Sequence, residues 1–254
     1  MVERTSGLIL VPFCRNNEEI WLSKSIDDGL SWLTPVPLPN LALSDWKWVG
    51  LGPPAGLQLT NGRLLIPGYH TTASKGDGLV SKGHVIISDD MGSTWRVSDT
   101  NIGFPYFTNE GQAVELENSS VLINFRTLSS RRVQSMSVDY GENFLEPFIP
   151  EGLTETVEGC EGSIVRDAST DTLYFSNPNN EAIIRRNMTI FKSTDAGQTW
   201  HPLVQVDSGA ASYSALLVTA PSEVAILYER SEDFNIIFEP DSIVFWRPSC
   251  GDNV

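Results

Sequence analysis

The sequence is poor in basic residues, and this shortage excludes several classes of partner. Its 254 residues include 17 lysines and arginines against 32 aspartates and glutamates, which gives a formal net charge of −15. A chain of this charge repels phosphate backbones and anionic lipid headgroups. Nucleic acids and anionic membranes are therefore not expected partners.

Cysteine and histidine are also scarce. Cys14, Cys160 and Cys250 are too few and too scattered for a disulfide framework, and none lies in a Cys-x-x-Cys pair, so one disulfide is the most that they could form. His70, His84 and His201 are not spaced three or four residues apart, so no helix-borne metal pair is expected. We predict neither a metal nor another cofactor.

Long hydrophobic runs are absent as well. The first residues lack the apolar core of a secretion signal, and the apolar run over residues 7–13 is short and contains Pro12. This run is typical of a buried strand. We expect a soluble chain without a membrane span, and its compartment and oligomeric state stay open.

What the sequence does contain is a repeat. Four segments follow the pattern Ser-x-Asp-x-Gly-x-Thr/Ser-Trp, with Asn-Phe at the end of the third copy, and begin about 50 to 60 residues apart. This period is typical of propeller blades. The four segments are Ser25–Trp32, Ser88–Trp95, Ser137–Phe144 and Ser193–Trp200.

Each element of the repeat has a mechanical role. The serine and aspartate side chains can accept hydrogen bonds from the backbone N–H groups of a tight turn. Glycine supplies a positive φ, and the aromatic residue anchors the hairpin in the core. We therefore interpret Asp27, Asp90, Asp139 and Asp195 as turn-capping residues and not as catalytic acids.

Short apolar runs of strand length lie between the repeats, each bounded by Gly, Pro, Asn or Ser. No long stretch has helical periodicity, and no Gly/Ser-rich or Pro-rich linker divides the chain. The sequence predicts an all-β fold in a single propeller domain over residues 1–254. Representative runs are 63–67, 84–88, 120–125, 172–176 and 223–228.

Two adjacent segments carry a more specific signal. Residues 109–116 read Asn-Glu-Gly-Gln-Ala-Val-Glu-Leu, and residues 121–126 read Val-Leu-Ile-Asn-Phe-Arg. They resemble a strand pair of the sialidase (neuraminidase) family, whose members are six-bladed β-propellers with this aspartate-box repeat. In that family the first glutamate is the base beside the nucleophile and the arginine binds the substrate carboxylate. The resemblance assigns these roles to Glu110 and Arg126.

Three later segments extend the resemblance, which runs from about Gly7 to Trp246. The Ser-Asn-Pro loop that ends at Pro178 and the segment 184–189 are similar to the family's, and they make Arg185 the second carboxylate-binding arginine. Segment 209–216 is similar to the one that bears the catalytic tyrosine, here Tyr213. Segment 227–230 resembles the strand whose glutamate, here Glu229, orients a further arginine.

The chemistry of the expected substrate explains these residue types. Sialic acid carries a carboxylate on its anomeric carbon, which repels an Asp or Glu nucleophile but admits a neutral phenol. Sialidases are the tyrosine exception among glycosidases. Because a phenol is a weak nucleophile at neutral pH, Glu110 must accept its proton. Arginine suits the carboxylate because its fork binds bidentately and stays charged.

Two parts of the family's pattern have no match here. They are the Phe/Tyr-Arg-Ile-Pro segment, which supplies a first arginine, and an aspartate general acid on a loop before the first repeat. Arg4 and Arg15 lack the required context, and the loop after the first strand offers only Glu18 and Glu19. The chain is either a truncated enzyme with an incomplete first blade or a pseudoenzyme that keeps sugar binding.

The resemblance therefore predicts an exo-α-sialidase that releases terminal sialic acid from sialylated glycoconjugates with retention. The alternative is a non-catalytic propeller that binds sialic acid, and a third is a scaffold whose repeats serve folding alone. Each site residue also has a plain structural interpretation, such as a strand-end ion pair or a buried tyrosine with a satisfied hydroxyl. A loop over residues 46–56, with two tryptophans, either covers the sugar or packs at the rim.

Overall fold

Antiparallel strands, most of them short, make up the regular secondary structure of the residues that the structure describes. The computed structural model describes residues 1–73, 80–232 and 240–248, and this part of the chain contains no helix. Continuous apolar runs become strands that are buried on both faces, as in Val121–Thr127, whose residues are nearly all buried. The all-β prediction is confirmed.

The strands form four hydrogen-bonded sheets. The first sheet has the order β1-β2-β3, the second β4-β6-β7-β8 with β5 paired to β6, and the third β11-β10-β9. Their bounds are β1 Ile9–Arg15, β2 Glu19–Ser25, β3 Val36–Pro37, β4 Trp48–Leu51, β5 Leu57–Gln58, β6 Leu64–Thr71, β7 Ser81–Ser88, β8 Arg96–Val97, β9 Thr108–Glu115, β10 Val121–Thr127 and β11 Val133–Ser137.

The fourth sheet runs in chain order from β12 to β17 and contains an unusually long strand. The first part of β15 pairs with β14 and its second part with β16, and Ala210 has partners on both sides. The sheet therefore consists of two blade-like units that share β15. Its strands are β12 Ser163–Asp167, β13 Thr172–Pro178, β14 Arg186–Ser193, β15 His201–Ala220, β16 Glu223–Ser231 and β17 Ser242–Trp246.

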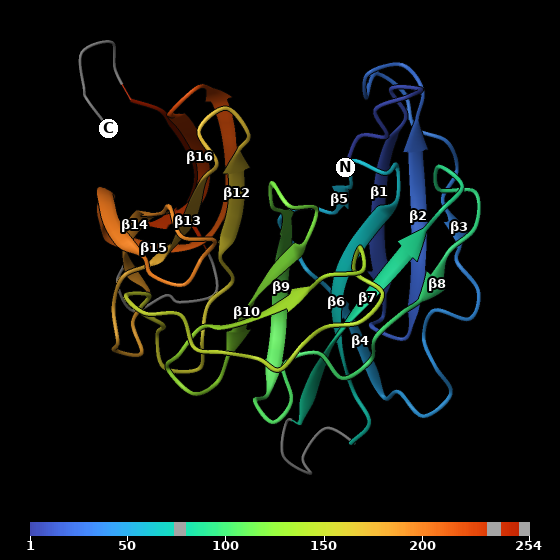
Figure 1. Cartoon of the computed structure of the whole chain (residues 1–254), viewed down its shortest axis with the longest axis horizontal. Coiled ribbons are helices and arrows are strands. Elements are labelled where there is room, and N and C mark those ends of the chain that lie inside the picture. Colours follow the sequence, from blue (N-terminus) through green and yellow to red (C-terminus); the bar gives the residue numbers. More distant parts are fainter. Residues whose placement is uncertain (74–79, 233–239, 249–254) are drawn as a thin grey trace.

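The sheets follow one another in chain order across the molecule, from the blue β1 to the red β16 (Figure 1). The first strands of successive units are neighbours, since β4 contacts β1, β9 contacts β4 and β12, and β12 contacts β15. Apolar clusters fill the spaces between successive sheets, as where Leu65 and Val85 meet Ile123 and Phe125. This arrangement is propeller-like, with five blade-like units in the described residues.

All four repeats make the same hydrogen bonds, so their predicted role as turn caps is confirmed. In the fourth copy, Ser193 Oγ donates to Asp195 Oδ1 at 2.7 Å, and the Gly197 amide donates to Ser193 Oγ at 3.0 Å. In the second copy, backbone and side-chain hydrogen bonds from Thr94 lower the pKa of Asp90 to about 2. These aspartates are occupied as ionised acceptors within their own turns.

The register places the repeats at one end of the strands and the predicted site residues at the other end. In the third sheet, Ser137, where a repeat begins, pairs with Val121, and Val121 pairs with Glu115. Glu110 and Arg126 lie at the other ends of these strands. The structural turns therefore lie at one end of the strands, and the candidate catalytic residues lie at the other end.

Two of the three histidines, His70 and His84, are buried inside the fold, and His201 is exposed. His70 and His84, on neighbouring strands β6 and β7, face each other with 3.2 Å between their Nδ1 atoms, and Trp46 stacks on His70. Burial lowers the pKa of His70 to about 4. Cys14 and Cys160 are free thiols, and Cys250 lies outside the described residues.

Candidate active site

A tyrosine and a glutamate from distant parts of the chain are in contact at the ends of the strands opposite the repeats. The hydroxyl of Tyr213, on β15, donates to Glu110 Oε1, on β9, at 2.7 Å. Burial, reinforced by the Glu110 carboxylate, holds the pKa of Tyr213 well above its usual value near 10. The phenol therefore stays protonated at neutral pH, with a carboxylate already placed to take its proton.

Arg126 joins both members of this pair. Its NH1 donates to Glu110 Oε2 at 2.7 Å and to the Tyr213 hydroxyl oxygen at 3.2 Å, while Nε and NH2 donate to the Glu158 carbonyl. The side chains of Arg126 and Glu110 are only 15% and 10% exposed. Burial opposes the guanidinium charge, but Glu110 outweighs it and raises the pKa of Arg126.

Arg185 lies on the other side of the tyrosine, immediately before β14. Its guanidinium carbon is 5.5 Å from the centre of the Tyr213 ring, and its NH1 and NH2 donate to Ser212 Oγ and to the Gly159 carbonyl, each at 2.9 Å. Arg126 bonds the preceding carbonyl, that of Glu158. One short backbone segment therefore holds both arginines beside the tyrosine.

Two glycines lie where the packing around the site leaves no room for a side chain. Gly159 has φ +71°, and a Cβ there would lie 2.7 Å from the Arg126 Cγ atom, so a larger residue would displace the guanidinium. A Cβ on Gly52 would overlap the carbonyl oxygen of Gly111, next to Glu110. The segment that follows β4 therefore packs directly against β9, the strand that carries Glu110.

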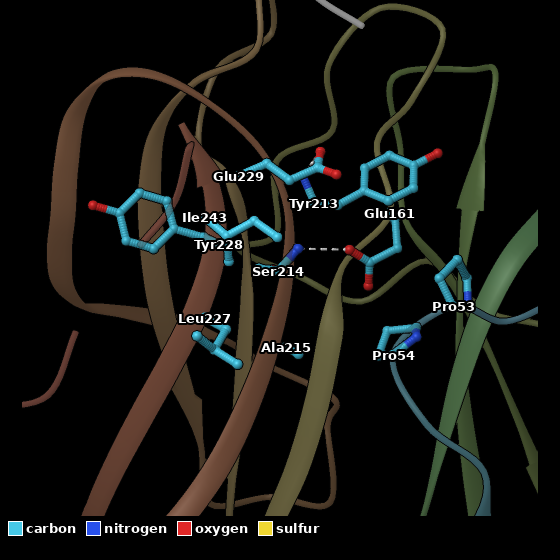
Figure 2. Close-up of a pocket in the computed structure, with 10 residues that line it drawn as sticks. All are labelled: Pro53, Pro54, Glu161, Tyr213, Ser214, Ala215, Leu227, Tyr228, Glu229 and Ile243. Carbon is cyan, nitrogen blue, oxygen red and sulfur yellow. Dashed lines mark hydrogen bonds between the residues drawn. The ribbon is translucent and has the colours of Figure 1, made fainter. Parts of the chain in front are cut away.

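Two further carboxylates hold the backbone around Tyr213. The Tyr213 amide donates to Glu229 Oε2 at 3.2 Å, and the Ser214 amide donates to Glu161 Oε2 at 2.8 Å. Figure 2 shows both carboxylates beside the tyrosine at the wall of a pocket, with Pro53 and Pro54 across from them. The pocket has a volume of about 260 Å³.

A second pocket, of about 240 Å³, lies on the β4–β6 side of the site and is lined by Trp48, Tyr69 and Asn109, the residue before Glu110. Tyr69 is close enough to Glu110 and Arg126 for its titration to respond to both charges, although burial is the main cause of its raised pKa. The expected loop over residues 46–56 is in part strand β4. Trp46 lies before this strand and packs against the core, and Trp48, its first residue, lines this pocket.

The structure brings all five predicted site residues together: Glu110, Arg126, Arg185, Tyr213 and Glu229. The alternative arginines lie elsewhere, because Arg4 donates to Gln58 and Arg15 lies 3.9 Å from Glu19 on the exposed turn between β1 and β2. Glu161 was not predicted from the sequence. Its only sequence signal is a carboxylate directly before a buried strand.

Metal and membrane features were searched over the same residues. Residues 1–73, 80–232 and 240–248 contain no group of three or more His, Cys, Asp or Glu side chains placed to hold a metal ion. Within those ranges there is also no helix that is long and apolar enough to span a bilayer.

Comparison with known proteins identifies the family. The model of the BNR repeat-like domain matches residues 3–226. This chain belongs to the BNR repeat-like proteins of the sialidase family. The sialidase of Bacteroides fragilis is 28% identical over 228 residues, which are 84% of this chain and 40% of that protein. Human sialidase-4 is 34% identical over 167 residues, 59% of this chain and 34% of that protein.

The fold of this sialidase-family chain is similar to that of solved sialidase structures. The intramolecular trans-sialidase from Ruminococcus gnavus, in complex with oseltamivir carboxylate, matches with a TM-score of 0.71 at 24% identity. The match covers 90% of this chain and 50% of the other. The chain thus spans about a third to two fifths of the length of the curated relatives described above.

Proposed function

We propose that this chain carries the reaction site of an exo-α-sialidase that hydrolyses terminal sialic acid from sialylated glycoconjugates with retention. Tyr213 is the nucleophile, Glu110 is its base, and Arg126 and Arg185 bind the sugar carboxylate. Glu229, to which the resemblance assigns the orientation of a further arginine, also accepts the backbone amide of the nucleophile. The relatives named as sialidases support the substrate class, and the residue contacts support the roles.

One observation carries the proposal: the phenol, the carboxylate and a guanidinium form a single hydrogen-bonded unit. Tyr213 donates to Glu110 at 2.7 Å, and Arg126 contacts both at 2.7 and 3.2 Å. A tyrosine buried only for packing needs one partner for its hydroxyl. Here the partner is a largely buried carboxylate, which is the group that a phenol nucleophile requires.

The site accounts for a two-step displacement. As the Tyr213 oxygen bonds to the anomeric carbon, the phenolic proton passes to Glu110, and the bond from that carbon to the aglycone oxygen breaks. Water then attacks the anomeric carbon and releases one proton to solvent, while the tyrosyl oxygen leaves and recovers a proton from Glu110; two inversions give retention. The aglycone oxygen needs a proton as it departs, and none of the assigned residues supplies it.

The two arginines suit an anionic substrate in an acidic protein. A guanidinium fork binds a carboxylate bidentately, and a largely buried site strengthens the contact relative to water. Both guanidinium groups lie beside the Tyr213 ring or hydroxyl. They therefore offset the net charge of −15 locally, at the point where the sugar carboxylate must lie.

The finer architecture belongs to the same proposal. We take residues 1–254 as one sialidase-type domain whose blade-like units belong to a six-bladed propeller with an incomplete first blade. The aspartate boxes at one end of the strands and the candidate site at the other end support this assignment.

An assay with a fluorogenic aryl sialoside tests the function. Because an aryloxide departs without a proton, it reports the tyrosine step even where no general acid acts. We expect release of sialic acid with retention, and slower release from a sialyl-oligosaccharide, whose alkoxide leaving group needs protonation. Saturable binding of an unsaturated sialic acid analogue without any release would indicate the non-catalytic alternative, and no binding would refute sialic acid recognition.

A further inference from the structure

The nucleophile proposed above lies on a β-bulge. Between β15 and β16, Ala211 pairs with Arg230 and Ser214 pairs with Tyr228, so β15 has one more residue than its partner over this stretch. A bulge removes ladder hydrogen bonds and redirects a side chain. The Tyr213 amide lies in this bulge and bonds a side chain of β16. The Ser214 amide that follows points away from β16, as does the Leu216 amide, and both bond side chains near the start of β12.

The acceptors of the Tyr213 and Ser214 amides are carboxylates in different environments. Glu229, on β16 itself, accepts the amide of Tyr213 at 3.2 Å. Glu161 comes from the segment before β12 and accepts the amide of Ser214 at 2.8 Å. Glu161 is only 1% exposed, and its Oε1 is buried without a hydrogen-bond partner in the described structure.

The charges around Glu161 favour its protonated form. Burial is the main cause of a pKa far above the ordinary value, and the carboxylates of Glu110, from β9, and Glu229, from β16, raise it further. The Ser214 amide and the Arg132 guanidinium, which lies just before β11, act in the opposite direction and are outweighed. These influences together favour the protonated form of Glu161.

We propose that Glu161 is a positioning residue of this site: it holds the Ser214 amide and thereby fixes the backbone immediately after Tyr213. The inference rests on the proposed function only in taking Tyr213 as the nucleophile. A neutral Glu161 accepts the hydrogen bond of the Ser214 amide without adding a third negative charge to those of Glu110 and Glu229. Its ionisation would repel the sugar carboxylate, so it sets an upper pH limit on substrate binding.

The test compares Glu161→Gln with Glu161→Leu. Glutamine keeps a neutral acceptor for the Ser214 amide, and leucine removes it. We expect kcat for the aryl sialoside to be about tenfold or more lower in Glu161→Leu than in Glu161→Gln, because small misplacements of a reacting group are costly. Above neutral pH, wild-type affinity for the unsaturated sialic acid analogue should fall more steeply than that of Glu161→Gln.

The protonation state is measured without turnover. The infrared difference spectrum between wild type and Glu161→Gln at pH 7 should contain the C=O stretch of a protonated carboxylic acid, which disappears as the pH is raised. Because the folded-state pKa is raised, the stability that Glu161 contributes is complete below its unfolded value and is lost as pH rises through the folded value. Glu161→Gln should lack this loss. Glu223→Gln, at the other end of β16, is the control and should keep the infrared band.

Two results would overturn the inference: no protonated-acid band at pH 7, or equal kcat in Glu161→Gln and Glu161→Leu. Failure of the proposed function would differ from this. It would abolish aryl sialoside release in every variant, while the infrared band and its disappearance at higher pH would still report on Glu161.

Discussion

Replacing Tyr213 with phenylalanine should lower kcat for an aryl sialoside by at least about three orders of magnitude, as expected for the loss of a covalent nucleophile. Phenylalanine keeps the ring that packs against Arg185 but removes the hydroxyl that Glu110 and Arg126 contact. The affinity for the unsaturated sialic acid analogue should therefore change by less than about tenfold, because both arginines remain and Glu110 and Arg126 keep their bond to each other.

Tyr228→Phe is the matched control. Tyr228 is also a buried tyrosine on this sheet, but its hydroxyl donates to Asp207 at 3.0 Å and points away from Tyr213 (Figure 2). We expect its loss to change kcat far less than the loss of the Tyr213 hydroxyl. If both variants retain wild-type turnover, Tyr213 is not the nucleophile.

The second large effect is expected on binding. Arg126→Met should weaken the binding of the unsaturated sialic acid analogue by about 30-fold or more, since truncating one member of a buried charge pair costs about 2–5 kcal/mol. The variant also leaves Glu110 without its ion pair, so kcat should fall as well. Isothermal titration and the aryl sialoside assay measure the two effects separately.

The control for this variant is Arg166→Met. Arg166 forms an ion pair with Asp171 at 2.6 Å, and the Asp171 side chain is 49% exposed. A surface pair of this kind contributes about 1 kcal/mol or less. Analogue affinity should be unchanged in this variant. Equal affinity in Arg126→Met and Arg166→Met would show that Arg126 does not bind the carboxylate.

Much of the fold could be predicted because its signals are local. Each aspartate box is an eight-residue turn whose hydrogen bonds connect residues two to four positions apart, so the sequence alone specifies it. The strands likewise follow from short apolar runs. The number of blades is different, because it depends on how sheets pack over long sequence separations, and six blades stay a prediction.

The candidate site was predictable only through the resemblance. Tyr213 and Glu110 are 103 residues apart, and no local pattern shows that they meet. The resemblance supplied both, together with the arginines and Glu229. Their roles stay predictions, although their side chains lie together.

Glu161 shows where sequence reasoning fails. Its importance depends on the side of β15 that faces away from β16, where the Ser214 amide bonds Glu161 and the Leu216 amide bonds Ser163 Oγ. The direction of these amides leaves no clear mark in the sequence, and neither does the burial of one carboxylate before β12. The pairing of His70 with His84 was missed for a related reason, since their spacing fits neighbouring strands and not a helix.

Covalent labelling with 2,3-difluorosialic acid tests the central claim most directly. Fluoride leaves the anomeric carbon without needing a proton, so the reagent depends on the nucleophile, its base and the carboxylate-binding arginines, and not on a general acid. After incubation and proteolysis, mass spectrometry should find the sugar on the peptide that contains Tyr213, and no label in Tyr213→Phe. An unlabelled wild-type chain, or a label on another residue, would contradict the account.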